Sequence, residues 1–216
     1  MLTLVVRSGA LSDETGPVRL FAALMLPPHV SQWLRARQER AVERSSRLPA
    51  ELRWAHPEQW HLTLAFFGEV EERHVDDLGA RLVRASARRP PLHLTLAAPG
   101  TFGSARRARV VWQGVGGDVV RLRGLAASCR AAGRRIGLQA DGLAARARFR
   151  PHVTLARLPR PGDVTDVLDV LAGSDYPSWH AEEAVLVRSD LGAGPRGRAR
   201  HTVLSRLPLQ AARDGR

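Results

Sequence analysis

The 216-residue chain lacks the residues on which several classes of protein depend. It has a single cysteine, Cys129, which excludes an internal disulfide bond and a zinc site built from cysteines. No stretch approaches the roughly 20 apolar residues that a membrane-spanning helix needs. The apolar start, MLTLVV, is too short for the core of a signal peptide, and no basic segment precedes it. We therefore expect a cytoplasmic protein without a membrane anchor.

Lysine and asparagine are absent, and isoleucine occurs once, at Ile136. All 33 basic residues are therefore arginines, and against 21 acidic residues they give a formal net charge of +12. A fold does not need such an excess, and nucleic acid is the obvious partner for it. The same composition also follows from a genome with GC-rich codons, which raises arginine use whatever the function. The net charge thus indicates that a partner would be negatively charged, but not where that partner binds.

Hydrophobic residues make up 44% of the chain, which is enough for a sizeable core and too many for a wholly disordered chain. Apolar runs and apolar–polar alternation predict strands at 18–26, 60–67, 92–97, 109–115, 149–155, 185–187 and 202–207, and helices at 28–47, 71–87, 118–132 and 163–171. Gly68 is expected to end the second strand, and Asp163 is expected to cap the last helix. Several neighbouring strands have connections too short for a crossover helix, which favours an α+β fold with largely antiparallel sheets. We expect a flexible extension over residues 1–17, one domain over 18–209 and a tail over 210–216.

One tetrapeptide, His-x-Thr-Leu, recurs in the predicted strands, and alanine follows it each time. Two of its copies begin at His61 and at His152. Residues two apart in a strand point to the same face, so His61 shares a face with Thr63, and His152 shares one with Thr154. If the two strands lay side by side, two imidazoles and two hydroxyls would converge on one place.

This set of groups suits the hydrolysis of a phosphodiester. A free histidine has a pKa near roughly 6.5, so one imidazole can be neutral while the other is protonated. The neutral imidazole can take a proton from attacking water and the protonated one can give a proton to the leaving oxygen, each role being worth roughly 10²–10⁴-fold in rate. The threonine hydroxyls can donate to the non-bridging oxygens, where negative charge accumulates. This scheme needs no metal ion, and we expect no cofactor.

The tetrapeptide alone does not identify the catalytic pair. A third copy begins at His93, and a near match with shifted spacing begins at His201. The pattern is also common in ordinary half-exposed strands. The flanking sequence therefore has to distinguish the copies.

Four segments of the sequence, taken in chain order, distinguish the copies of the motif. Residues 18–27 form an apolar opening strand that ends in Leu-Pro, and Arg53 and Trp54 precede the first His-x-Thr-Leu motif at 61–70. Residues 149–157 read Phe-Arg-Pro-His-Val-Thr-Leu-Ala-Arg, and a closing strand lies at 200–209. Over about residues 18–209 the chain resembles the bacterial and archaeal RNA 2′,3′-cyclic phosphodiesterases. This family, long called 2′-5′ RNA ligases, lies within the two-histidine (2H) phosphoesterase superfamily.

The resemblance implies a two-lobed α+β fold with pseudo-twofold symmetry, in which each lobe contributes one motif strand to a central groove. It implies that His61 is the general acid and His152 the general base. Thr63 and Thr154 would hold the phosphate. Arg157 matches the arginine that contacts the phosphate in the family, a role that suits a rigid guanidinium with several donors.

The implied activity is metal-independent hydrolysis of RNA 2′,3′-cyclic phosphate ends to 2′-phosphates. The resemblance leaves His93 and His201 with structural roles. Two alternatives remain: the reverse reaction, which joins RNA ends by a 2′-5′ bond, and a non-catalytic RNA-binding protein that keeps the fold. In every case RNA is the expected partner. We expect a monomer that needs no protein partner. Arg146, Arg148 and Arg150 lead into the second motif and could contact an RNA backbone.

Overall fold

The computed structural model describes residues 16–45, 48–138 and 149–210. The strands are β1 (Val18–Met25), β2 (Arg53–Trp54), β3 (His61–Val70), β4 (Leu92–Thr101), β5 (Ala108–Gly117), β6 (His152–Gly162), β7 (Ser178–Ala181), β8 (Glu183–Asp190) and β9 (Arg200–Pro208). The α-helices are α1 (Pro28–Arg44), α2 (Val75–Ser86), α3 (Val119–Arg134) and α5 (Thr165–Leu171). No helix in these ranges is long and apolar enough to cross a membrane. Of the predicted extension over residues 1–17, only Gly16 and Pro17 lie within the described residues.

All the strands pair in an antiparallel manner in one sheet, in the order β7-β4-β5-β6-β3-β1-β8-β9, with β2 beside β6. The two motif strands, β3 and β6, are neighbours at the middle of this order. The succession β1-α1-β3-α2 is repeated by β5-α3-β6-α5, and the strand order on one side of the centre mirrors that on the other. The predicted two-lobed α+β fold with pseudo-twofold symmetry is thus confirmed.

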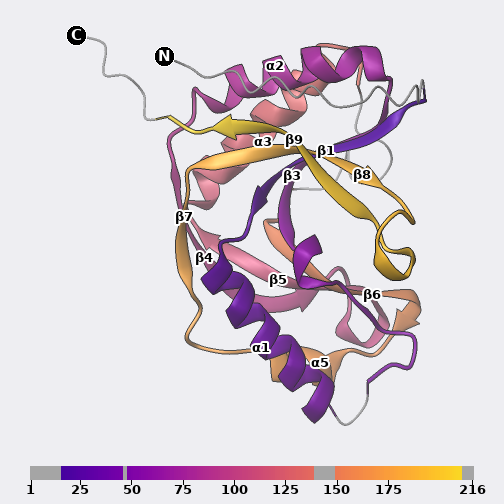
Figure 1. Cartoon of the computed structure of the whole chain (residues 1–216). Coiled ribbons are helices and arrows are strands. Elements are labelled where there is room, and N and C mark those ends of the chain that lie inside the picture. The colour runs from indigo at the N-terminus through magenta and orange to yellow at the C-terminus, as the bar shows by residue number, and fades with distance from the viewer. Residues whose placement is uncertain (1–15, 46–47, 139–148, 211–216) are drawn as a thin grey trace.

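The helices pack in pairs, one pair on each lobe (Figure 1). Helices α2 and α3 contact each other and the lobe that contains β3, β8 and β9, whereas α1 and α5 contact each other beside the lobe that contains β4. Helix α1 follows β1 and helix α3 follows β5, so each of these helices crosses to the lobe opposite the strand that precedes it. The two lobes therefore exchange helices.

The core fixes the orientation of both motif strands. Leu62 and Leu64 on β3, and Val153 and Leu155 on β6, are almost completely buried, while the His and Thr residues between them are half-buried on the other face. Burying each aliphatic side chain is worth roughly 1.5–3 kcal/mol. A slip of one residue would place the histidines in the core and these side chains in water, so the register is strongly specified.

Gly68 does not end β3, contrary to the prediction. The strand continues to Val70, and Gly68 has a φ of 71° where the pairing with β1 shifts between Leu20 and Phe21. A glycine with positive φ is what a β-bulge accommodates at no steric cost, so here it bends the strand instead of terminating it.

Helix α5 begins two residues later than the sequence predicts, and its N-cap is Val164. The Asp163 carboxylate still serves the helix start, because it accepts hydrogen bonds from the Thr165 backbone N–H at 3.0 Å and from the Thr165 hydroxyl at 2.7 Å.

Candidate active site

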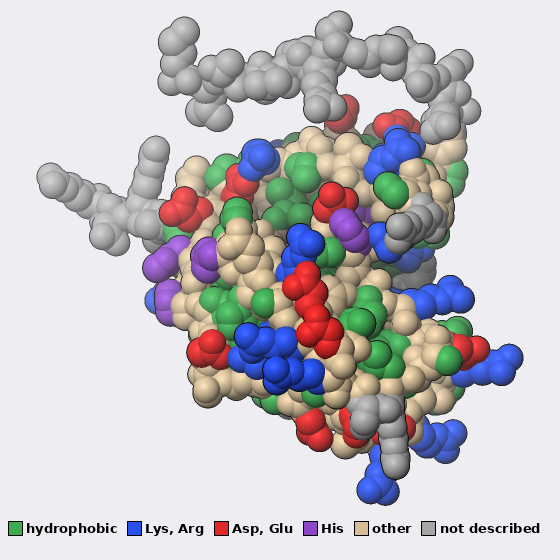
Figure 2. Space-filling view, turned by 60° about the horizontal axis from the view of Figure 1, so that its bottom comes forward, with side chains coloured by type: hydrophobic (Ala, Val, Ile, Leu, Met, Phe, Trp, Pro, Cys, Tyr) green, Lys and Arg blue, Asp and Glu red, His purple; other side chains and the backbone are tan. Residues whose placement is uncertain are grey.

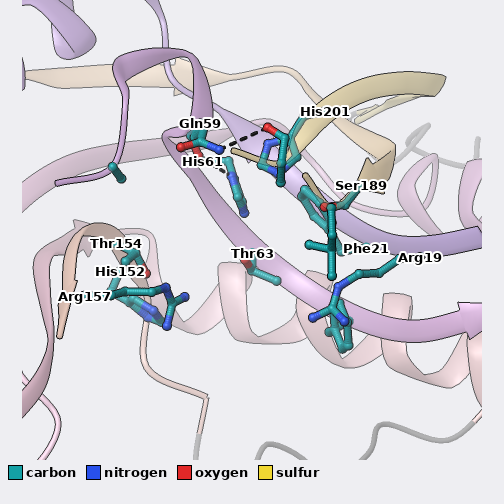
Figure 3. Close-up of a pocket in the computed structure, with 14 residues that line it drawn as sticks. Arg19, Phe21, Gln59, His61, Thr63, His152, Thr154, Arg157, Ser189 and His201 are labelled. Atoms are coloured by element: carbon teal, nitrogen blue, oxygen red, sulfur yellow. Dashed lines mark hydrogen bonds between the residues drawn. The ribbon is translucent and has the colours of Figure 1, made fainter. Parts of the chain in front are cut away.

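The two motif strands meet at a single ladder pair, Leu62 opposite Val153. In an antiparallel pair the register continues outward from such a position, so His61 comes on the side of Thr154 and Thr63 on the side of His152. Figure 3 shows His152 and Thr154 grouped on one wall of the site, with His61 and Thr63 on the other.

A groove of about 360 Å³ lies over this junction, and all five candidate residues line it. These five are His61, Thr63, His152, Thr154 and Arg157. Further lining residues come from β1, from the turn before β3 and from the β8–β9 hairpin: Arg19, Phe21, Gln59, Ser189 and His201. Both lobes thus contribute to one site.

Both imidazoles are held by the same kind of hydrogen bond. The Nδ1 atom of His61 lies 2.7 Å from the carbonyl oxygen of Gln59, and that of His152 lies 2.7 Å from the carbonyl oxygen of Arg150. Because a carbonyl oxygen can only accept, each Nδ1 carries a hydrogen. The Nε2 atom of each ring is then the one that can exchange a proton with a bound molecule.

Aromatic contacts fix the plane of each imidazole. The His61 ring stacks on Phe21 with centroids 4.6 Å apart, and His201 lies edge-on to it at 5.4 Å. The His152 ring is edge-on to Phe102 at 5.1 Å. These contacts restrict ring rotation, which keeps the two Nε2 atoms in one geometry.

Burial lowers the pKa of both histidines. The pKa of His61 falls to about 4, mainly because burial disfavours the charged imidazolium; the Gln59 carbonyl opposes this, and the positive charges of His201, His152 and Arg157 add to it. Burial also lowers the pKa of His152, with the Arg150 carbonyl opposing and Arg157 adding. In the free protein both rings are therefore neutral at neutral pH. A bound anion would raise both pKa values.

Three donor side chains in the groove lack an acceptor in the part of the chain that the structure describes. Within the described ranges, neither the Arg157 guanidinium nor the hydroxyls of Thr63 and Thr154 have a hydrogen-bond or ion-pair partner. Partial burial lowers the pKa of Arg157 as well, although the residue stays exposed to solvent. An accessible cation beside unpaired hydroxyls is an arrangement that binds an anion with several oxygens.

The third copy of the motif and the near match have different surroundings. His93 lies on β4, exposed, with its ring 5.0 Å from His180 on β7, and it does not line the groove. His201, for which the sequence predicts a structural role, lines the groove and contacts His61. Only its near match to the motif marked it in the sequence.

Gln59 is a site residue that the sequence analysis missed. Its carbonyl orients His61, and its side-chain amide donates to the carbonyl oxygen of Ala199 at 3.1 Å, next to β9. Its place two residues before His61 is the only signal for it in the sequence. Arg146 and Arg148 lie outside the described residues, and Arg150 lies over the Trp112 ring at 4.6 Å.

No cluster of three or more His, Cys, Asp or Glu side chains that could hold a metal ion occurs in the parts of the chain that the structure describes. The expectation that the reaction needs no metal stays a prediction, which an assay in the presence of a chelator tests.

We expect the stability of the protein to fall in acid because of His61. Its pKa is about 4 in the folded protein and about 6.5 when unfolded, so between these values the unfolded chain binds a proton that the folded chain does not. The contribution is fully present above about pH 6.5 and is lost as the pH falls toward 4; the loss relative to neutral pH amounts to about 2–3 kcal/mol at about pH 4.5. Urea unfolding at neutral pH and at about pH 4.5 measures this loss.

The variants His61→Gln and His93→Gln provide the comparison. The first removes the buried imidazole and should show a smaller loss in acid than the wild type, while the second changes an exposed histidine and should behave like the wild type. An equal loss in the wild type and in His61→Gln would contradict the assignment.

A pseudosymmetric antiparallel sheet with one His-x-Thr pair from each lobe facing a shared groove defines a two-histidine phosphoesterase. The comparisons with known proteins agree. The family model described as "LigT like Phosphoesterase" matches residues 24–112. The RNA 2′,3′-cyclic phosphodiesterase of Thermus thermophilus is 34% identical over 200 residues, which cover 89% of this chain and 91% of that protein. The chain belongs to the RNA 2′,3′-cyclic phosphodiesterase family.

Two further comparisons show how much of each chain the similarity covers. The crystal structure of E. coli LigT complexed with 3′-AMP has a TM-score of 0.64 and 29% sequence identity, and the match covers 91% of this chain and 99% of that chain. The RNA 2′,3′-cyclic phosphodiesterase of Geobacillus stearothermophilus is 32% identical over 174 residues, which cover 80% of this chain and 52% of that protein. The chain thus spans about half the length of several curated relatives that it matches.

Proposed function

We propose that the protein hydrolyses RNA ends that carry a 2′,3′-cyclic phosphate and leaves a 2′-phosphate. The observation that carries this proposal is the convergence of two Nε2 atoms, two unpaired hydroxyls and one unpaired guanidinium on a single groove. The names of the relatives, and the 3′-AMP in the E. coli LigT complex, support a nucleotide phosphate as the ligand.

In this proposal the phosphate lies between the two motif strands. Arg157 and the hydroxyls of Thr63 and Thr154 donate hydrogen bonds to its non-bridging oxygens. Negative charge on these oxygens increases as water adds to phosphorus, so the donors bind the transition state more strongly than the ground state.

The two histidines move the protons. Nε2 of His152 takes a proton from the attacking water, whose oxygen forms the new bond to phosphorus. The bond between phosphorus and the 3′ oxygen breaks, and Nε2 of His61 gives its proton to that oxygen. Binding of the anionic phosphate is what protonates His61, because a negative charge beside this ring opposes the effect of burial on its pKa. The assignment of acid and base, and the 2′-phosphate product, rest on the family resemblance.

The test is turnover of an RNA oligomer that ends in a 2′,3′-cyclic phosphate, with EDTA present. Hydrolysis to a 2′-phosphate end supports the proposal. Loss of activity in EDTA would contradict the metal-independent mechanism, and formation of a 2′-5′ linked product at a high concentration of RNA ends would favour ligation. Binding of this RNA without any turnover would favour the non-catalytic alternative. The cytoplasmic location, the monomeric state and the limits of the single domain at residues 18–209 stay predictions.

The pH dependence of the reaction should reflect the lowered pKa values. The base must be neutral, so activity rises with pH through its pKa, and the acid must be protonated, so activity falls with pH through its pKa. Because burial lowers both pKa values in the free protein, we expect kcat/KM to be greatest below about pH 6.5. The alkaline limb of kcat should lie at higher pH than that of kcat/KM, since kcat reports the complex with the bound anion. Coincident alkaline limbs would show that substrate does not protonate the acid.

A further inference from the structure

A second hollow lies between α2 and α3, the helix pair at the top of Figure 1. It has a volume of about 320 Å³ and is lined by five arginines together with Ser128 and three alanines. We call it the arginine groove, defined by the residues Arg81, Arg84, Arg88, Arg89 and Arg135.

Few acidic side chains balance these arginines. Helix α3 contains no acidic residue, and the two acidic residues of α2 both lie in its first turn. One of these, Asp77, pairs with Arg81 through both carboxylate oxygens at 3.0 Å. Within the described part of the chain, the guanidinium groups of Arg84, Arg88 and Arg135 have no hydrogen-bond or ion-pair partner. The groove therefore presents positive charge that nothing described in the protein neutralises.

Some arginines on another face of the protein are paired with acidic side chains. On the face shown in Figure 2, acidic and basic side chains lie close together. In helix α1, Arg35 pairs with Glu39 at 3.0 Å, and Arg37 pairs with Asp175 at 2.9 Å. Single arginines that are unpaired within the described ranges, such as Arg40 and Arg44, also occur on the exposed surface, but the hollow between α2 and α3 gathers five arginines around one space.

Arg89 is held in place at the groove. Its Nε and Nη2 atoms donate to the Ser128 hydroxyl at 3.2 and 2.8 Å, and that hydroxyl donates to the Gly124 carbonyl oxygen at 3.0 Å. Its backbone N–H donates to the Ser86 carbonyl, and its carbonyl accepts from Gln210. A Cβ on Gly124 would lie 3.1 Å from Nη1, so glycine leaves room for the guanidinium. A fixed guanidinium loses little conformational entropy when it binds a phosphate.

The arginine groove and the active site are on opposite faces of β3. Helix α3 packs against Phe67, since a Cβ on Gly133 would lie 2.9 Å from that ring, whereas Phe66 lines the active-site groove. A ligand that contacts both hollows must therefore be longer than a single nucleotide.

We propose that the arginine groove binds backbone phosphates of an RNA whose reacting end occupies the active site. Several guanidinium groups around one hollow match successive phosphates of a chain better than they match one small anion. The inference rests on the proposed function for the identity of the reacting end, and it adds that longer RNA binds more tightly than a mononucleotide.

The test measures binding of a fluorescent single-stranded RNA of about 20 nucleotides that ends in a 3′ hydroxyl, at several salt concentrations. The variant Arg84→Ala/Arg88→Ala/Arg135→Ala is compared with the control Arg40→Ala/Arg44→Ala/Arg160→Ala. The control removes the same charge from exposed arginines that line neither groove. We expect the groove variant to bind about tenfold more weakly or worse and to lower the slope of log K against log salt by about 2, because each phosphate contact on a single strand contributes about 0.7.

The outcomes separate this inference from its alternatives. Wild-type affinity in the groove variant, or equal weakening in the control, would overturn the proposal, the latter because net charge alone would explain it. Inorganic phosphate is added as a competitor. If it displaced the RNA at a concentration similar to the concentration of phosphate groups in the RNA, the groove would be a site for a single anion, which would also overturn the proposal. Equal melting temperatures of the two variants verify that both fold.

Hydrolysis of adenosine 2′,3′-cyclic phosphate distinguishes a failure of the RNA-binding proposal for the arginine groove from a failure of the proposed function. This mononucleotide is too short to reach the arginine groove, so the groove variant should hydrolyse it at the wild-type rate. If the wild type hydrolysed neither this mononucleotide nor the cyclic phosphate oligomer, the proposed function would be refuted. The comparison of RNA binding between the two variants would still stand.

Discussion

Alanine in place of His61 or of His152 is expected to lower kcat by roughly 10²–10⁴-fold, because each change removes one proton-transfer group from the reaction. The matched control is His93→Ala, which changes the third copy of the tetrapeptide at an exposed position outside the groove and should leave turnover unchanged. Single-turnover hydrolysis of a cyclic phosphate oligomer measures all three. A loss in His93→Ala alone would mean that the wrong pair of motifs has been assigned.

A substrate with sulfur in place of the bridging 3′ oxygen separates the roles of the two histidines. A thiolate leaves without a proton donor, so the variant that lacks the general acid should recover much of its rate on this substrate. We expect recovery for His61→Ala and none for His152→Ala. The opposite result would exchange the two roles.

The second large effect is expected from Arg157→Lys. Lysine keeps the charge but loses the fixed fork that can donate two hydrogen bonds to one phosphate, and removing one transition-state donor typically costs roughly 10²–10³-fold in kcat. The Arg157 guanidinium has no hydrogen-bond or ion-pair partner among the described residues, so the change breaks no side-chain hydrogen bond or ion pair in that part of the protein.

Arg160→Lys is the control for this prediction, since Arg160 lies three residues further along β6, exposed and outside the groove. We expect it to keep the wild-type rate. An unchanged rate in Arg157→Lys would contradict a role for the planar guanidinium, and a comparable loss in Arg160→Lys would point to a general effect of arginine on RNA binding.

The sequence predicts the fold class and the longer elements because their apolar patterns are strong. Strands β1, β3 and β6 bury alternate or continuous apolar residues, and α1 begins at Pro28 as expected. The short strands β2 and β7 were not predicted, because two to four residues are too few for alternation to be visible. Their pairing with β6 and β4 depends on strands that are distant in the sequence.

The local motif gives the chemical groups of the site, but not their surroundings. The His-x-Thr spacing places one imidazole and one hydroxyl on the same face of a strand, which follows from the period of a strand. The contacts of His61 with Phe21 and His201 depend on how β1 and the β8–β9 hairpin pack across the sheet. Nothing local to these residues reports that packing, so His201 was assigned to the structure instead of the site.

The exchange of helices between the lobes also determines when each lobe can be completed during synthesis. The lobe that contains β1 and β3 needs β8 and β9, which are the last strands of the chain, while the other lobe joins the early helix α1 to the late elements α5 and β7. Neither lobe can therefore close on the ribosome until nearly all of the chain has emerged. The long-range contacts between β1 and β8 make slow folding the physical expectation. The two halves of the site are then assembled in one late step, so a truncated chain would hold neither half in place.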